Sequence, residues 1–271
     1  MFENQSIGFI GGGNMGEALI RGLLSTGLFP AERITVYDVS ASRIAYLAKE
    51  YGIGTSRNVS ELAASSGILL LAVKPQTMSA VLNELRSHVA HGPLVISIAA
   101  GIPLAMLQGA LPEGTAVVRV MPNTPALVLK GASALSRGKN VSVEQMEMSL
   151  ALFRAVGKAV ETEEKWMDTV TGLSGSGPAF VLLMIEALID SGVLMGLPRH
   201  LSRELAVQTV LGTALMVDQT GKHPGELKDM ITSPGGTTIY GLKVLEAKSV
   251  RGAFMEAVEA ASKRSEELGK G

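Results

Sequence analysis

Cysteine is absent from the 271 residues of this sequence. Its absence excludes disulfides, thiolate metal sites and cysteine nucleophiles. The four histidines form no metal-binding motif with acidic residues, and the sequence has neither a Gly-x-Ser-x-Gly elbow nor a His-Glu-x-x-His motif. The sequence therefore gives no support to hydrolase chemistry or metal chemistry, and we expect no metal site.

Aromatic residues are also scarce, at 4%, in a chain that is 46% hydrophobic. The core must therefore be largely aliphatic, with 13 methionines available to fill irregular gaps. The formal net charge is -1 and no block of like charge occurs, so nothing favours nucleic acid or an anionic membrane as a partner. Residues 1–5 are polar and acidic without an apolar signal core, and runs such as residues 68–73 are too short to span a bilayer. We therefore expect a cytoplasmic protein.

Short apolar runs alternate with helical patterns in the first part of the chain. Repeated strand–helix units of this length predict an α/β domain in which a parallel sheet carries helices on both faces. The predicted strands are residues 7–10, 34–37, 53–55, 68–73, 94–98, 117–120 and 132–135. The predicted helices between them are residues 15–24, 42–51, 78–89 and 143–156.

The pattern changes near residue 162, after which almost no strand signal remains. The predicted helices there are residues 178–194, 198–218, 234–246 and 250–268. We therefore predict two domains, an α/β domain over residues 1–162 and an all-helical domain over residues 163–271. The helix at residues 178–194 is apolar nearly all round, which indicates burial on several sides and predicts an obligate dimer.

A glycine-rich loop follows the first predicted strand and opens the first helix. Gly11 permits a tight turn, Gly13 lets the backbone approach a pyrophosphate, and Gly16 lets helix and strand pack closely. An acid, Asp38, ends the second strand, as in a dinucleotide-binding Rossmann unit. The predicted cofactor loop consists of Gly11, Gly12, Gly13, Asn14, Met15 and Gly16.

The sequence leaves the choice of dinucleotide open. Asp38 suits the ribose hydroxyls of NADH and would repel a 2′-phosphate. Ser40, Ser42 and Arg43 lie just beyond it and suit the 2′-phosphate of NADPH. The alternative is that Asp38 caps the following helix. We expect NADPH or NADH as cofactor, with Asp38 and Ser40 in the binding site.

Three later segments follow predicted strands, where ligands bind in doubly wound sheets. Lys74 is placed to face a ligand, although an ordinary exposed lysine fits the sequence as well. Asn123 lies in a loop made rigid by flanking prolines, and a plain structural turn is the alternative. The cofactor-binding residues predicted from these segments are Val73, Lys74, Pro75, Ala99, Ala100, Gly101 and Asn123.

Residues 173–178 and 232–238 are rich in hydroxyls and glycine, and each is predicted to open a helix. A helix N-terminus can bind a carboxylate through its free N–H groups, while simple capping is the alternative. Capping accounts for Ser233 and Pro234 but not for Gly235 and Gly236, since glycine in a first turn costs roughly 1 kcal/mol. We therefore expect a ligand to approach the backbone there.

The segment at residues 231–242, Ile-Thr-Ser-Pro-Gly-Gly-Thr-Thr-Ile-Tyr-Gly-Leu, closely resembles the signature of the pyrroline-5-carboxylate reductases. Other blocks look like those of the same family, in order, at residues 8–15, 72–75, 121–125, 175–179 and 223–225. The resemblance covers essentially the whole chain. One departure is Asp38-Val39, where many relatives carry a polar-basic pair suited to NADPH.

The resemblance implies reduction of 1-pyrroline-5-carboxylate to L-proline with NAD(P)H, the last step of proline biosynthesis. It implies that Thr238 hydrogen-bonds the imine nitrogen, and that the helical domain forms a homodimer, often assembled into decamers. In such a dimer the Ser233–Thr238 block serves the neighbouring subunit's site. The substrate-binding residues implied are Ser176, Ser233, Gly235, Gly236, Thr237 and Thr238.

Two other functions share the glycine loop. A 3-hydroxyacid dehydrogenase resembles this chain in its opening and its helical second domain, but such enzymes carry a catalytic lysine in a segment that here, at residues 176–190, has none. A non-catalytic dinucleotide-binding sensor is the other alternative, and the intact block around Thr238 argues against it.

Overall fold

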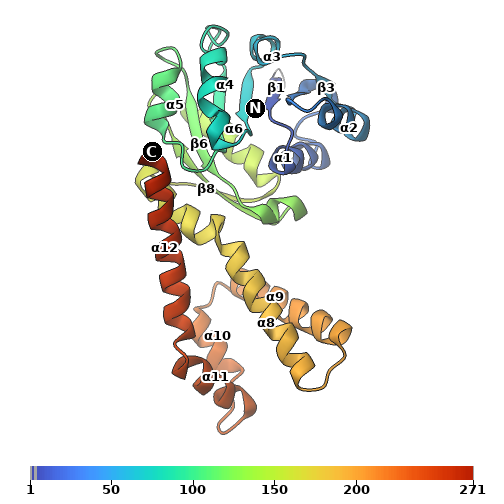
Figure 1. Ribbon diagram of the computed structural model, residues 1–271, viewed down its shortest axis with the longest axis vertical. Helices are drawn as coiled ribbons and strands as arrows, with labels where there is room; N and C mark the ends of the chain where they lie inside the picture. Colours follow the sequence, from blue (N-terminus) through green and yellow to red (C-terminus); the bar gives the residue numbers. More distant parts are fainter. Residues whose placement is uncertain (1, 3–4, 271) are drawn as a thin grey trace. The chain divides into compact units, whose positions relative to one another are not determined.

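The computed structural model describes residues 2 and 5–270, so that residues 1, 3 and 4 of the polar start lie outside the described part. The chain forms two compact units (Figure 1). The first runs up to Ser176 and resumes at Ala260, and the second is Gly177–Glu259. The predicted domain boundary between residues 162 and 163 stays a prediction.

An eight-stranded sheet lies at the centre of the first unit, with the strand order β3-β2-β1-β4-β5-β6-β7-β8. Neighbouring strands are parallel except β6 and β7, which are antiparallel. The doubly wound sheet is therefore confirmed, with one antiparallel pair that the sequence did not predict. The strands are β1 (Ile7–Ile10), β2 (Ile34–Tyr37), β3 (Gly54–Thr55), β4 (Ile68–Leu71), β5 (Leu94–Ser97), β6 (Val117–Met121), β7 (Gly131–Arg137) and β8 (Gly157–Glu161).

Helices cover both faces of this sheet (Figure 1). One apolar cluster includes Leu19, Leu47 and Phe153 from α1, α2 and α6. A second cluster, on the other face, includes Leu62 and Leu82 from α3 and α4, with further side chains from α5. The short helices α3 and α5 were not predicted. The bounds are α1 (Asn14–Ser25), α2 (Ala41–Tyr51), α3 (Val59–Ser65), α4 (Met78–Leu85), α5 (Leu104–Ala110) and α6 (Val143–Arg154).

The segment predicted to open a helix at residues 173–178 lies instead inside a helical run. A 3-10 turn (Glu164–Trp166) leads into α7 (Met167–Val170) and then a π-helical turn at Thr171–Gly175, before α8 (Gly177–Leu194). Pro178 explains the irregularity, because it has no N–H for the carbonyl of Ser174 and its ring crowds the preceding turn. The prediction of a free helix N-terminus at this segment was wrong.

The second unit is helical throughout. It contains α8, α9 (Arg199–Thr220), α10 (Pro224–Met230), α11 (Thr237–Ala247) and the first part of α12 (Val250–Lys270). Helices α8 and α9 pack closely, since a Cβ at Gly192 would lie 2.1 Å from Ser202 Oγ, which donates to the Ile189 carbonyl at 2.6 Å. Helix α10, in a region predicted to be a break, was missed.

Helix α8 has no buried residue within the chain. Leu182 and Leu183 are 65% and 68% exposed although both are large and apolar. Within the described residues, one helical run, Glu164–Leu194, is long and apolar enough by composition to cross a membrane. Large apolar side chains exposed along one helix indicate a surface that a partner covers.

Candidate cofactor and substrate site

The glycine loop follows β1 at the point of the sheet where β1 and β4 are neighbours. This is the topological switch point, because β2 and β3 lie on one side of it and β4 to β8 on the other. Gly11 has a φ of +102°, and a Cβ there would lie 2.5 Å from the Ala72 carbonyl oxygen. A Cβ at Gly16 would lie 2.6 Å from the Gly11 carbonyl oxygen, whereas one at Gly13 would meet nothing within 4 Å. Gly11 and Gly16 are thus needed for packing, and the space over Gly13 is left open for a ligand.

Helix α1 begins at the same place without a capping side chain. Its N-cap is Gly13, which makes no side-chain cap hydrogen bond, and Gly13 and Asn14 are both exposed. The first-turn N–H groups and the positive end of the helix dipole therefore face open space, which suits a pyrophosphate.

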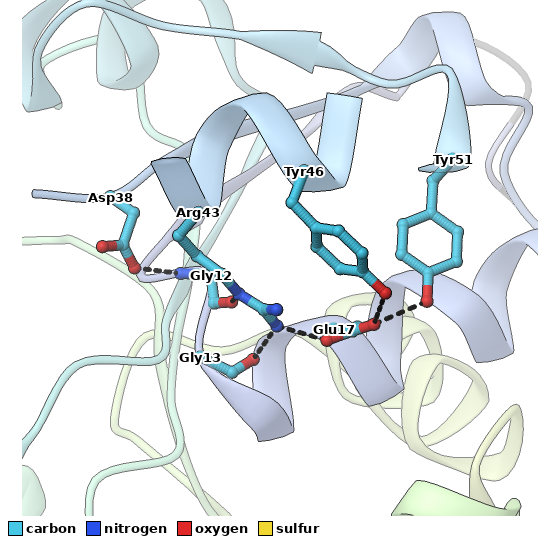
Figure 2. A network of polar contacts seen from close by, with 7 residues as sticks. All are labelled: Gly12, Gly13, Glu17, Asp38, Arg43, Tyr46 and Tyr51. Atoms are coloured by element: carbon cyan, nitrogen blue, oxygen red, sulfur yellow. Dashed lines mark hydrogen bonds and ion pairs between the residues drawn. The ribbon is translucent and has the colours of Figure 1, made fainter. Parts of the chain in front are cut away.

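Asp38 lies beside this loop at the end of β2 (Figure 2). Its carboxylate accepts the Gly12 N–H at 2.7 Å and the Ser40 N–H at 2.9 Å. The cap of α2 is Ser40, whose Oγ accepts the Arg43 N–H at 3.3 Å. The alternative that Asp38 caps this helix is therefore wrong, and its carboxylate is oriented toward the glycine loop.

Arg43 reaches across the same loop (Figure 2). Its Nε donates to the Gly12 carbonyl, one Nη donates to the Gly13 carbonyl at 3.5 Å, and the same Nη pairs with Glu17 of α1. Tyr46 and Tyr51 both donate their hydroxyls to Glu17, at 3.1 and 2.7 Å.

The charges of this network affect one another. Burial raises the pKa of Glu17, but hydrogen bonds from Tyr51 and Arg43 outweigh it and hold the pKa below its ordinary value. Burial and the hydrogen bond to Glu17 raise the pKa of Tyr51 well above its ordinary range. Glu17 is therefore a carboxylate and Tyr51 a neutral phenol at physiological pH. The sequence did not single out Glu17, because its partners come from another helix.

The first unit has two hollows among residues that the sequence predicted as binding residues. The first, of about 580 Å³, opens beside Asp38, with Ala41, Ile44 and Arg57 among its lining residues. It is placed for the adenosine end of a dinucleotide.

The second hollow, of about 670 Å³, lies at the carboxyl ends of β4 and β5. It gathers four residues that the sequence predicted as binding residues, namely Pro75, Ala100, Gly101 and Ser176. The end of α12 closes one wall, where Gly269 lies close to the Gly101 carbonyl. The sequence missed this wall, since no local pattern shows that the C-terminal helix returns to the first unit.

The remaining predicted residues differ in their surroundings. Lys74 is exposed at its loop, Val73 packs partly against the core and Ala99 is buried. Asn123 donates to the Ser174 carbonyl at 3.0 Å and accepts the Ala132 N–H at 2.8 Å. Pro178 has no N–H to donate to the Ser174 carbonyl, and Asn123 donates to that carbonyl in its place. Asn123 therefore stabilises the π-helical turn.

A buried arginine, also missed from the sequence, lies in a polar network that reaches one residue of the second hollow, Ser265. Arg119 of β6 is 7% exposed and lies 3.2 Å from Glu164, which also accepts the Leu104 N–H at 2.6 Å. Asp168 lies 3.9 Å from Arg119 and accepts the Ser265 hydroxyl at 2.6 Å. The one signal in the sequence was an arginine inside an apolar strand. Among the described residues no cluster of three or more His, Asp or Glu is arranged to hold a metal.

The hydroxyl- and glycine-rich block at residues 232–238 lies in the second unit. Helix α11 begins at Thr237 with Gly236 as its N-cap, so the two glycines precede the helix. Gly235 has a φ of +64° and the Gly236 N–H bonds the Ser233 carbonyl at 3.1 Å, which is the pattern of a type II turn with Pro234 at its second position. The prediction that Pro234 opens the helix was wrong, and the left-handed backbone explains Gly235 without a ligand.

The helix start itself is still open. Gly236 makes no side-chain cap hydrogen bond, and the turn in front of it is largely exposed. Thr238 is the second residue of α11 and is partly buried. The first-turn N–H groups are therefore available to a carboxylate, with a hydroxyl one residue into the helix.

Comparison with known proteins gives the same picture over the whole chain. Residues 164–268 match a family model described as pyrroline-5-carboxylate reductase dimerisation. A pyrroline-5-carboxylate reductase from Methanosarcina acetivorans is 52% identical, with 99% of each chain covered. The chain belongs to the pyrroline-5-carboxylate reductase family. Residues 6–101, which contain the glycine loop, also match a model described as NADP oxidoreductase, coenzyme F420-dependent.

Solved structures of the pyrroline-5-carboxylate reductase family have the same fold. That from Coxiella burnetii is 35% identical with a TM-score of 0.94, covering 99% of this chain and 100% of its own. That from Plasmodium falciparum, solved with NADP bound, is 37% identical with a TM-score of 0.89, covering 98% and 99%. The resemblance to this family seen in the sequence is thus confirmed, and the comparisons favour it over the hydroxyacid dehydrogenase and the sensor.

Proposed function

We propose that this chain reduces 1-pyrroline-5-carboxylate to L-proline with NADPH or NADH, as the last step of proline biosynthesis. The observation that carries the proposal is that this member of the family has two helices, α1 and α11, whose N-termini have no capping side chain. Helix α1 begins beneath an open glycine loop, and α11 begins after the family's Ser-Pro-Gly-Gly-Thr-Thr block. The first suits a pyrophosphate and the second a substrate carboxylate.

The residues of the first unit fit a dinucleotide. The N–H groups after Gly13 would hold the pyrophosphate, and Asp38 would hold the adenosine ribose. Pro75, Ala100 and Gly101 would border the nicotinamide, where small side chains leave room for the ring. When bound, the reduced nicotinamide supplies a hydride to the substrate.

The residues of the second unit fit the substrate. The backbone from Ser233 to Thr237 would hold the carboxylate at the start of α11, which fixes the ring relative to Thr238. The Thr238 hydroxyl would donate a hydrogen bond to the neutral imine nitrogen and relay a proton to it. A protonated cyclic imine is already electrophilic, so this chemistry requires no histidine or cysteine in the chain.

We propose a homodimer built by the helical unit, and five such dimers in a decamer. The exposed apolar side chains of α8, including Leu182 and Leu183, support a partner chain as their cover. The dimerisation family model spans this helix, which favours a second copy over a membrane. The net charge of -1, without basic blocks, supports a cytoplasmic enzyme that binds neither nucleic acid nor membrane.

Steady-state kinetics on the purified full-length chain test the function. We expect oxidation of NADPH and of NADH that depends on 1-pyrroline-5-carboxylate and yields one proline per cofactor. Oxidation that instead follows 3-hydroxyacid or semialdehyde partners would replace the proposal, and cofactor binding without turnover would indicate the sensor.

A further inference from the structure

We propose that Glu17 sets the cofactor selectivity of this enzyme by restraining Arg43, so that the arginine does not reach the 2′-phosphate of NADPH. This inference rests on the proposed use of a nicotinamide cofactor and assigns selectivity to a residue outside the β2–α2 segment. It concerns the seven residues drawn in Figure 2.

Asp38 and Arg43 lie on opposite sides of one residue, Gly12. The Asp38 carboxylate accepts the Gly12 N–H, and Arg43 Nε donates to the Gly12 carbonyl. A ribose held by Asp38 would bring a 2′-phosphate next to the first turn of α2, where Ser40, Ser42 and Arg43 lie. Arg43 is therefore the arginine of the β2–α2 segment that could reach a 2′-phosphate, and Arg57 lines the hollow beside Asp38 from β3 onward.

The guanidinium is committed elsewhere. It pairs with Glu17, lies against the Gly12 and Gly13 carbonyls and stacks 5.2 Å from the centre of the Tyr46 ring. The ion pair is largely sheltered, with side chains that are 25% exposed for Arg43 and 20% exposed for Glu17. A pair with this geometry is stronger than an open surface pair, which water and salt screen.

Glu17 is itself fixed from a second direction. The hydroxyls of Tyr46 and Tyr51 both donate to its Oε1, while Arg43 takes Oε2. The two tyrosines therefore keep the Glu17 carboxylate in place, and it would not move with Arg43 if the arginine turned toward a phosphate. To bind a 2′-phosphate, Arg43 must leave the largely sheltered Glu17 carboxylate without its cation, and that cost offsets the new Arg–phosphate interaction.

NADH requires no such exchange. The 2′-hydroxyl of a bound NADH would donate to Asp38 while Arg43 stays paired with Glu17. The network thus favours NADH in two ways: the Asp38 charge repels a 2′-phosphate, and Glu17 holds the Arg43 guanidinium away from it. Replacing Glu17 should release Arg43 and improve binding of the 2′-phosphate alone.

Calorimetric titration of the full-length protein with 2′,5′-ADP and with 5′-AMP measures this directly, because the two probes differ only by the 2′-phosphate. We expect Glu17→Gln to tighten 2′,5′-ADP binding about tenfold, as one charge-assisted hydrogen bond predicts, and to leave 5′-AMP within about twofold. Tyr51→Phe, which loosens Glu17 but keeps its charge, should shift 2′,5′-ADP in the same direction by less.

Two further variants separate restraint of Arg43 from general charge. Glu50→Gln on α2 removes an equal charge that is not paired with Arg43, and should not discriminate between the probes. Arg43→Ala should cost little 2′,5′-ADP affinity in the parent protein but should abolish the gain in the Glu17→Gln protein. Circular dichroism on each variant checks that it is folded.

The outcomes are distinct. Equal effects of Glu17→Gln on both probes, or an equal loss from Arg43→Ala in both backgrounds, would overturn the inference. The ratio of kcat/KM for NADPH to that for NADH should follow the binding data. A protein whose probe binding shifts as expected but which does not reduce 1-pyrroline-5-carboxylate would refute the proposed function and leave the inference standing.

Discussion

Replacing Gly13 should weaken cofactor binding without destabilising the fold, because a side chain at this position would contact no other residue. Gly13 has a φ of -64° and a ψ of -172°, which any residue adopts, and a Cβ there meets nothing within 4 Å. Gly13→Val should therefore change the free energy of unfolding by less than about 1 kcal/mol, the scale of an N-cap substitution. The valine would occupy the space through which a pyrophosphate must approach α1.

The expected loss of affinity follows from the contacts displaced. A hydrogen bond between a backbone N–H and a charged phosphate contributes about 1.5–3 kcal/mol, so losing one weakens cofactor binding roughly 10- to 150-fold. Isothermal titration with NADP⁺ and NAD⁺ measures this, and urea unfolding measures stability. Both cofactors should be affected alike, since they share the pyrophosphate.

Gly11→Ala is the matched comparison, with the opposite profile. Its φ of +102° is strained for alanine, and the added Cβ would lie 2.5 Å from the Ala72 carbonyl oxygen. Strain of this kind costs about 1–3 kcal/mol before the clash is counted, so this variant should be clearly destabilised. A folded Gly13→Val protein with unchanged cofactor affinity would refute the placement of the pyrophosphate over α1.

Four other predictions concern single residues. Thr238→Ala should lower kcat by about 30- to 1,000-fold, from roughly 2–4 kcal/mol of lost transition-state stabilisation, with cofactor affinity unchanged; a folded variant with normal kcat removes Thr238 from the mechanism. Asp38→Ala should shift the kcat/KM ratio toward NADPH about fivefold, from roughly 1 kcal/mol of relieved repulsion, and an unmoved ratio would show that Asp38 does not face the ribose. Leu183→Glu should convert a dimer, of twice the 28.3 kDa chain mass, into monomers in sedimentation experiments, since Leu183 is 68% exposed within its own chain; an intact dimer would place the interface elsewhere. Because the folded-state pKa of Glu17 is depressed, its stabilisation is present above the ordinary value of 4.5 and lost as pH falls below it, so the difference in urea stability between the parent protein and Glu17→Gln should shrink in acid.

The doubly wound sheet was predictable because its central strands are fully buried and read as short apolar runs. Strands β1, β4 and β5 have every residue buried, and each was predicted close to its observed bounds. Strand β8 was missed for the opposite reason. As an edge strand with the sequence Gly-Lys-Ala-Val-Glu it is half exposed, so it has no apolar run to detect.

The candidate site was predictable where a residue's role depends on its own backbone. Gly11 and Gly16 occupy positions where a Cβ clashes, so the glycine pattern reports the turn directly. Residues whose role depends on distant partners could not be assigned from the sequence, although Arg119 stands out as an arginine inside an apolar strand. Arg119, Glu17 and the Gly101-facing end of α12 act through contacts 26 or more positions away in the chain. The start of α11 was misplaced because Ser-Pro suits a helix cap and a type II turn equally well.

The return of α12 to the first unit has a consequence for how the protein can be made and divided. The chain leaves this unit after Ser176 and re-enters it at Ala260, so the helical unit is in effect an insertion. A fragment that stops at Ser176 would lack the hydroxyl of Ser265 that Asp168 binds and the wall that Gly269 forms beside Gly101. During synthesis, the cavity at the ends of β4 and β5 is completed only once residues 261–269 have left the ribosome. A free-standing nucleotide-binding module would have to carry residues 260–269 on a linker, and a tag fused directly after residue 271 would lie next to the cavity.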